Sequence, residues 1–156
     1  EGVPGGQTPL IEAGRLSGYL YDLKSAHRGN TRSTGNGNRS TYQSGPGVKP
    51  SNLVLSGMEQ DSAQLHNSYD TVLMVDGVMG MHTVNRVNGD FSVGATGYLL
   101  KKGERVHPVK QITLSGNFLS CLKHIESMGN DVESFPYGGN ILCPSILVPD
   151  MIVSGS

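Results

Sequence analysis

The fold is decided by the stretch Val87-Asn88-Gly89-Asp90-Phe91-Ser92-Val93-Gly94-Ala95-Thr96-Gly97-Tyr98-Leu99-Leu100. It begins with a polar turn and continues as a run in which small and large residues alternate. Asn-Gly between segments that can form strands is the strongest short-range signal for a β-hairpin. The small residues of the run predict a strand over which another backbone lies close. They are Ser92, Gly94, Ala95 and Gly97.

The length and the charge of the chain limit what it can be. With 156 residues it has about one domain's worth of sequence, so we expect a single domain over residues 1–156. A net charge of -1 gives no electrostatic reason to expect nucleic acid or an anionic membrane as a partner. Its apolar runs are far shorter than the roughly 20 residues that span a bilayer. Nothing at its start has the pattern of a secretory leader, so we expect a cytoplasmic protein.

The two cysteines, Cys121 and Cys143, are too few for a disulfide framework. Free thiols in a reducing compartment are the favoured interpretation, and a bridge is the alternative.

Glycine is the unusual component, at 22 of 156 residues. Apolar runs separate the glycines, which predicts many short strands joined by tight turns. We therefore expect an α+β fold dominated by antiparallel sheet. The clearest helix is expected at about 117–128, where one apolar stripe recurs every three or four residues, with Asn117 as N-cap and Gly129-Asn130 as C-cap. One or two shorter helices are expected, at 23–28 and 62–68.

The strands are expected between these helices. A hairpin is predicted over 7–22, with its turn at Glu12-Ala13-Gly14. The other predicted strands are 51–56, 71–75 ending at Asp76-Gly77, 109–115, 141–148 and 151–153. The polar segment from Asn30 to Pro50 is long for a connection in a compact domain. It is either a functional loop or a disordered one.

No motif for catalysis stands out. The sequence has no His-Glu-x-x-His and no Gly-x-Ser-x-Gly, and its five histidines are scattered singly. We therefore predict no catalytic residue and no metal ligand. The Gly-Asn pairs at 116–117 and 129–130 have two interpretations. Helix capping is the favoured one, and strand addition by an extended peptide along exposed glycine backbone is the alternative.

A longer pattern resembles a known family. The chain looks like the C-terminal domain of the TldD/PmbA family over nearly its whole length. The segments that carry the resemblance, in order along the chain, are Leu10–Leu20, Gly45–Leu53, Asn88–Tyr98, Val106–Asn117, Gly129–Val132 and Pro144–Val148.

The resemblance implies a zinc-dependent peptidase that works as a two-subunit assembly, in a family linked to peptide maturation and to degradation of unfolded peptides. One subunit type carries a helical His-Glu-x-x-x-His motif upstream of the region seen here, and the PmbA or TldE type lacks it. The metal-bearing type also supplies a cysteine ligand in a longer insertion after the Gly-Asn-Asp segment. Cys143 abuts Pro144 after a short interval, so this chain is more similar to the metal-free type. Zinc is then expected in the partner subunit and not in this chain.

The leading hypothesis is that this chain is the C-terminal domain of a longer protein of this type. It would contribute a peptide-binding cleft and subunit assembly, with an extended peptide and a homologous subunit, in a homo- or heterodimer, as its partners. The alternative is a stand-alone β-rich binding module without enzymatic activity. The residues predicted to bind substrate are Asn36, Asp90, Phe91, Gly116, Asn117, Gly129, Asn130 and Asp131.

Overall fold

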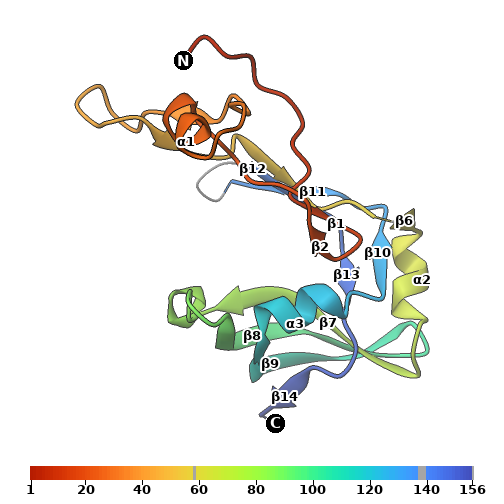
Figure 1. Cartoon of the computed structure of the whole chain (residues 1–156). Helices are drawn as coiled ribbons and strands as arrows, with labels where there is room; N and C mark the ends of the chain where they lie inside the picture. The colour runs from red at the N-terminus through yellow and green to blue at the C-terminus, as the bar shows by residue number, and fades with distance from the viewer. Residues whose placement is uncertain (58, 137–139, 156) are drawn as a thin grey trace. The chain divides into compact units, whose positions relative to one another are not determined.

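The computed structural model shows an α+β chain, as predicted, with mostly antiparallel strands and three short α-helices (Figure 1). It describes residues 1–57, 59–136 and 140–155. The helices are α1 (Leu23–Arg28), α2 (Ser62–His66) and α3 (Phe118–Lys123), with a 3-10 turn, η1, at Met81–Thr83. The strands are β1 (Ile11–Glu12), β2 (Arg15–Leu16), β3 (Gly37–Asn38), β4 (Gly47–Val48), β5 (Asn52–Val54), β6 (Glu59–Gln60), β7 (Thr71–Met79), β8 (Asp90–Lys101), β9 (Glu104–Asn117), β10 (Ser127–Gly129), β11 (Glu133–Phe135), β12 (Asn140–Cys143), β13 (Ile146–Leu147) and β14 (Ile152–Ser154). No helix among the described residues is long and apolar enough to cross a membrane.

The chain divides into two compact units. The first contains Glu1–Val54 and Ser134–Leu142, and the second contains Leu55–Glu133 and Cys143–Ser156. Both cysteines are half-buried free thiols in the structure, as expected.

The first unit is built from short strand pairs and one helix. β1 and β2 form a hairpin at the predicted turn, whose residues Ala13 and Gly14 both have positive φ, but its strands are much shorter than the predicted span 7–22. β3 and β4 pair within the segment 30–50, so part of this long polar segment forms a regular hairpin. α1 begins at a capping box, in which the Asp22 side chain accepts from the Ser25 backbone N–H at 2.6 Å. β12 runs parallel to β5.

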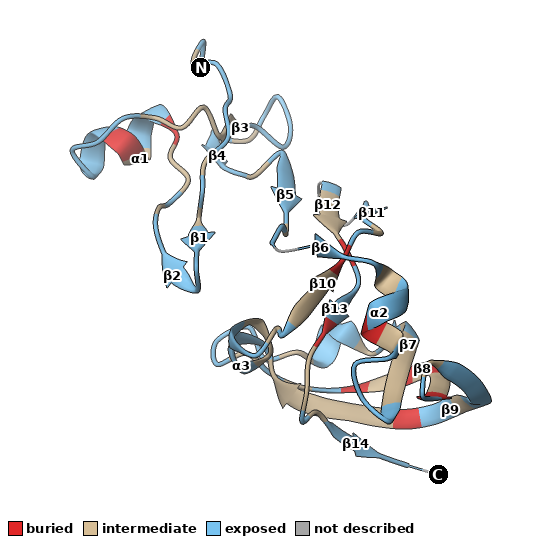
Figure 2. Cartoon of the chain, turned by 90° about the vertical axis from the view of Figure 1, so that its right-hand side faces the viewer, coloured by how far each residue is buried: buried red, intermediate tan, exposed pale blue. Residues whose placement is uncertain are grey.

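The second unit is built around a four-stranded antiparallel sheet in the order β14-β9-β8-β7. Figure 2 shows buried residues on its central strands and also on α2, β10 and β13. Val93, Ala95 and Leu100 of β8 are buried, together with Ile112 of β9. A smaller sheet, β13-β10-β6, lies in the same unit, and α2 contributes the buried Leu65.

The two-residue hairpin turn lies elsewhere than predicted. β8 and β9 are joined by Lys102-Gly103, whose φ angles of 48° and 79° suit a tight primed turn. Asn88-Gly89 instead closes the longer loop between β7 and β8. The Asn85 side chain accepts from the Val87 and Asn88 N–H groups there, and the Asn85 backbone carbonyl accepts from Gly89 at 2.8 Å. Local side-chain hydrogen bonds therefore hold this loop without a two-residue turn.

The helix predicted at about 117–128 is half that length. It begins after Asn117 as expected, but α3 ends at Lys123 and residues 127–129 form β10. Met128 pairs with Glu59 on one side and Ile146 on the other. Pairing with two distant strands satisfies the backbone hydrogen-bonding groups of this segment, so tertiary contacts outweigh the helical pattern of its side chains.

The strand predicted at 71–75 does not end at Asp76-Gly77. β7 continues to Met79 through a bulge at Asp76. The Asp76 carboxylate accepts a hydrogen bond from the Thr96 hydroxyl at 3.0 Å, which holds the bulged residue on the neighbouring strand. One extra residue bends the strand without terminating it.

Candidate functional site

Two of the predicted site residues meet at the end of the main sheet. Asp90 and Asn117 face each other across β8 and β9, and the Asn117 Nδ2 group donates to Asp90 Oδ1 at 2.8 Å. The same amide donates to the Asn88 carbonyl at 2.8 Å, and Asn117 Oδ1 accepts from the Ser120 N–H at 3.2 Å. Asn117 is therefore the N-cap of α3, and it also ties the β7–β8 loop to β9. Both of its amide hydrogens are engaged within the fold.

Phe91 and Gly116 form the next pair along the same ladder. A Cβ atom at Gly116 would lie 3.2 Å from the Phe91 ring and 3.2 Å from the Met151 methyl group. Phe91 is half-buried. Phe91 and Gly116 therefore pack closely at the end of the sheet, next to the Asp90–Asn117 pair.

The remaining predicted residues of the second unit form a separate cluster around Asp131. Its carboxylate accepts from the Ser145 N–H at 3.0 Å and from the Ser145 hydroxyl at 2.7 Å, and these bonds lower the pKa of Asp131. Asn130 Oδ1 accepts from the Ser62 N–H at the start of α2, and the Gly129 N–H donates to the Ser145 carbonyl at 2.7 Å. This cluster joins β10, the chain before β13, and α2.

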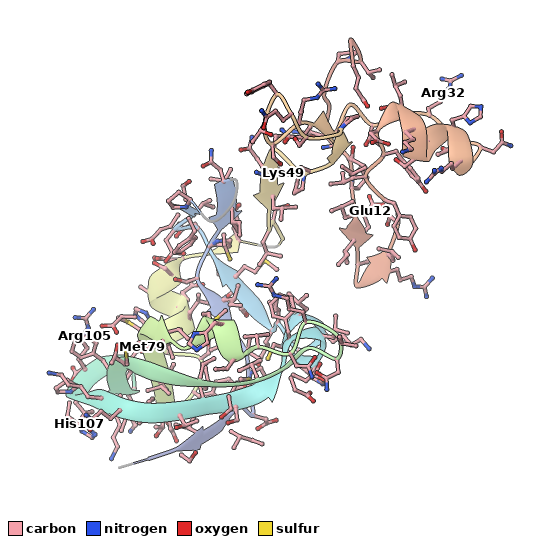
Figure 3. The ribbon with its side chains drawn as sticks, turned by 90° about the vertical axis from the view of Figure 1, so that its left-hand side faces the viewer. Glu12, Arg32, Lys49, Met79, Arg105 and His107 are labelled. Atoms are coloured by element: carbon pink, nitrogen blue, oxygen red, sulfur yellow. The ribbon has the colours of Figure 1, made fainter. Side chains whose placement is uncertain are left out.

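Asn36 belongs to the first unit and lies in a hollow there. The hollow has a volume of about 320 Å³, and its lining among the described residues includes the charged Lys49, labelled in Figure 3. Asn36 Oδ1 accepts from the Thr34 hydroxyl at 2.7 Å, and its backbone carbonyl accepts from the Lys49 N–H at 3.0 Å. The hollow is lined by Gly5, Gly6, Gly35, Asn36, Gly37, Asn38, Lys49, Pro50 and Ser51.

A second hollow, of about 230 Å³, lies in the second unit beside α3. It includes the predicted residues Gly116 and Asn117, and three that sequence reasoning did not select: Cys121, His124 and Met151. The Cys121 thiol lies 3.5 Å from the Met151 sulfur, and burial raises the pKa of this thiol. Thirty residues separate the two sulfur atoms, so no local pattern signals their contact.

The structure thus distributes the predicted residues over three places: the end of the β8–β9 ladder, the Asp131 cluster and the Asn36 hollow. Among residues 1–57, 59–136 and 140–155, no three side chains of His, Cys, Asp or Glu form a group that could hold a metal ion. The Cys143 thiol contacts the Pro144 carbonyl at 3.3 Å, and burial raises the pKa of this thiol.

Comparison with known proteins decides the family. The protein-family model described as "PmbA/TldA metallopeptidase C-terminal domain" matches residues 1–155. The chain belongs to this family. Metalloprotease PmbA of Escherichia coli O157:H7 is 32% identical to this PmbA/TldA-type chain, over 99% of the chain and 31% of that relative.

Solved structures agree with the family assignment. The Thermotoga maritima protein TM0727, described as a modulator of a DNA gyrase, matches with a TM-score of 0.86 and 36% identity, over 98% of this chain and 34% of its own. TldE from Thermococcus kodakarensis matches with a TM-score of 0.88 and 26% identity, over 99% of this chain and 35% of its own. This PmbA/TldA-type chain spans about a third of the length of the relatives that it matches.

Proposed function

We propose that this chain is the part of a PmbA/TldD-type metallopeptidase that holds an extended peptide and docks a homologous subunit in the cytoplasm. Cleavage of the peptide bond is then supplied by a zinc site outside these residues. Family membership gives the reaction class, and the accessible surface of the chain carries the assembly role.

The chain exposes 11321 Å² of accessible surface. Two separate folded monomers with the sizes of the first and second units would together expose only about 9,000 Å² of accessible surface, by the scaling of surface with mass. The surplus of roughly 2,000 Å² exceeds the ~800 Å² that each partner contributes to a standard interface. The exposed side chains include large apolar ones: Leu16 is 60% exposed, Leu119 58% and Ile152 66%. A large exposed surface with many apolar side chains is typical of a region that contacts other protein in an assembly.

The Asn36 hollow supports the peptide-holding role. Four of its nine lining residues are glycines and a fifth is Ser51, so much of the lining is backbone. A ligand that presents its own backbone amides suits such a lining, because it needs no matching side-chain pockets. The volume of about 320 Å³ is that of a short peptide segment and not of a folded domain.

The test is reconstitution with a metal-bearing sibling subunit. The tagged 156-residue chain is mixed with a purified sibling that carries the His-Glu-x-x-x-His motif, and co-elution and hydrolysis of an unfolded reporter peptide are measured. We expect a stable complex and hydrolysis by the mixture that exceeds hydrolysis by the sibling alone. A control variant that adds charge to the exposed apolar surface, Leu119→Lys, shows whether the complex depends on this surface.

Two results would contradict the proposal. The first is no complex at micromolar concentrations together with no effect on hydrolysis, which would favour a stand-alone binding module. The second is hydrolysis by this chain in the absence of any sibling.

A further inference from the structure

A thiol, a thioether and an imidazole gather in the hollow beside α3. Cys121 lies within α3, His124 is the C-cap of this helix, and Met151 precedes β14. All three side chains line the same hollow of about 230 Å³. The fold therefore brings two sulfur atoms and a ring nitrogen together from segments that are far apart in the sequence.

The two sulfur atoms are close enough to share one ion. Cys121 Sγ lies 3.5 Å from Met151 Sδ. With metal–sulfur bonds of about 2.3 Å, the length of thiolate bonds to zinc, one ion reaches both atoms with an angle of about 100° between the bonds. A Cβ atom at Gly116 would lie 3.2 Å from the Met151 methyl group, so this methyl group packs on the end of the sheet. Packing thus holds the thioether beside the thiol.

The imidazole of His124 is oriented in the way that suits a metal ligand. Its Nδ1 lies 2.7 Å from the Ser120 carbonyl oxygen. A carbonyl oxygen only accepts, so Nδ1 carries the hydrogen and donates it, which leaves Nε2 of the neutral ring as a bare ligand atom. Metal-binding histidines usually have this second hydrogen bond, because it fixes the tautomer and the ring. His124 is also exposed, which gives an ion a path from solvent.

The donor set selects a soft metal ion. Thiolate and thioether ligands favour Cu(I), whereas zinc takes thiolate, imidazole and carboxylate ligands. Burial raises the pKa of the Cys121 thiol, so the thiol keeps its proton until an ion displaces that proton into solvent. The thioether of Met151 is the ligand that distinguishes this group from a zinc site.

We infer that Cys121, Met151 and His124 bind one Cu(I) ion in the second unit. The ion would connect α3 to the segment that leads into β14, and binding it to the folded chain alone would stabilise the fold. This site is separate from the peptide-holding and docking roles, and it does not depend on them.

The experiment titrates the 156-residue chain with Cu(I), kept reduced by ascorbate without oxygen, in competition with a chromophoric Cu(I) chelator. We expect one Cu(I) per chain, a rise in Tm at saturation, and no displacement by excess zinc. Loss of a group that only orients a ligand costs about 10- to 100-fold in metal affinity. Met151→Leu removes a ligand itself and should weaken binding at least as much.

Three further variants locate the ion. Cys121→Ser should lose the bound Cu(I) and the rise in Tm, and His124→Gln should weaken binding. The matched control is Cys143→Ser, because Cys143 is also a half-buried thiol but contacts the Pro144 carbonyl. This control should bind Cu(I) as the wild type does. If Cys121→Ser does not fold, Met151→Leu decides, since leucine nearly conserves the volume of methionine.

Three outcomes would overturn the inference. The first is equal Cu(I) affinity for the wild type and Met151→Leu, and the second is loss of binding in Cys143→Ser. The third is one Cu(I) per two chains with a doubled size in size-exclusion chromatography, which would indicate a bridge between thiols of two chains.

Discussion

Gly97→Ala should be the most damaging small substitution in the second unit. Gly97 is buried at the point where β7 bulges, opposite Val75. An added Cβ atom would overlap the Met74 carbonyl oxygen and lie 2.9 Å from the Met74 carbonyl carbon and 3.0 Å from Val75 Cα. All three are backbone atoms, so no side chain can rotate away, and β7 must separate from β8.

The matched control is Gly94→Ala on the same strand. The nearest atoms to its Cβ would be Met79 side-chain atoms at 3.8 Å, which is ordinary contact. Overpacking of a well-packed site costs about 1–3 kcal/mol, and immobile backbone atoms place Gly97→Ala at about 3 kcal/mol or above. Gly94→Ala should be neutral or stabilising by about 0.5 kcal/mol, because alanine loses less backbone entropy on folding.

The assay is urea unfolding of the three chains, followed by circular dichroism, with thermal melts as a second probe. A loss of about 3 kcal/mol corresponds to a fall in Tm of roughly 12–24 °C for a unit of this size. Equal stabilities for Gly97→Ala and Gly94→Ala would refute the close approach of β7 to β8 and the bulge geometry built on it.

Three further predictions concern the polar clusters. Asp131→Asn should lower the free energy of unfolding by about 1–2 kcal/mol at pH 7. Because the pKa of Asp131 is lowered in the folded chain, the ionised carboxylate stabilises the fold above the ordinary carboxyl pKa, and this stabilisation is lost as the pH falls through the lowered folded pKa. The urea midpoints of wild type and variant should therefore converge in acid. Asn117→Ala removes the N-cap of α3 and both loop ties, and should cost about 2 kcal/mol in the same assay, whereas Asn117→Asp, which keeps the cap acceptor, should recover less than half of that loss because it faces Asp90. The hydrogen bond from Tyr69 to Glu126 raises the pKa of Tyr69, so Glu126→Gln should shift one tyrosine ionisation in an ultraviolet titration to lower pH; an unchanged titration curve would count against this bond.

The sequence predicted the parts of the fold that depend on local chemistry. The start of α2 at Ser62, the turn at Ala13-Gly14 and the alternation along β8 rest on neighbouring residues, and each lies where the pattern placed it. The same locality explains why Asn117 was recognised as a helix cap.

The errors came where a distant strand decided the outcome. Met128 continues a helical stripe in the sequence, but pairing with Glu59 and Ile146 makes it a strand residue. Asp76-Gly77 reads as a strand end, yet the Thr96 hydroxyl converts it into a bulge. In each case a partner at least 18 residues away in the sequence overrides the local pattern. A single sequence does not show whether the local pattern or the distant contact determines the structure.

The candidate site was predictable only as a set of unusual residues. Asn117 caps α3 as the favoured interpretation predicted. Gly129-Asn130 does not form the predicted C-cap, because α3 ends at Lys123, Gly129 lies in β10 and Asn130 accepts from the Ser62 N–H. The contact between Cys121 and Met151 and the terminal position of β7 in its sheet arise from topology, and no motif marks them. Whether the eight predicted residues touch a peptide stays a prediction.

The central claim is that this chain binds an extended peptide and docks a homologous subunit, while the reaction occurs at a zinc site elsewhere. The most direct test is to supply the purified 156-residue chain with zinc, measure the bound metal after dialysis, and incubate the chain with an unfolded reporter peptide. The account predicts saturable binding of the peptide, no stoichiometric zinc and no cleavage until a metal-bearing sibling is added. One tightly bound zinc per chain with cleavage by the chain alone would contradict it.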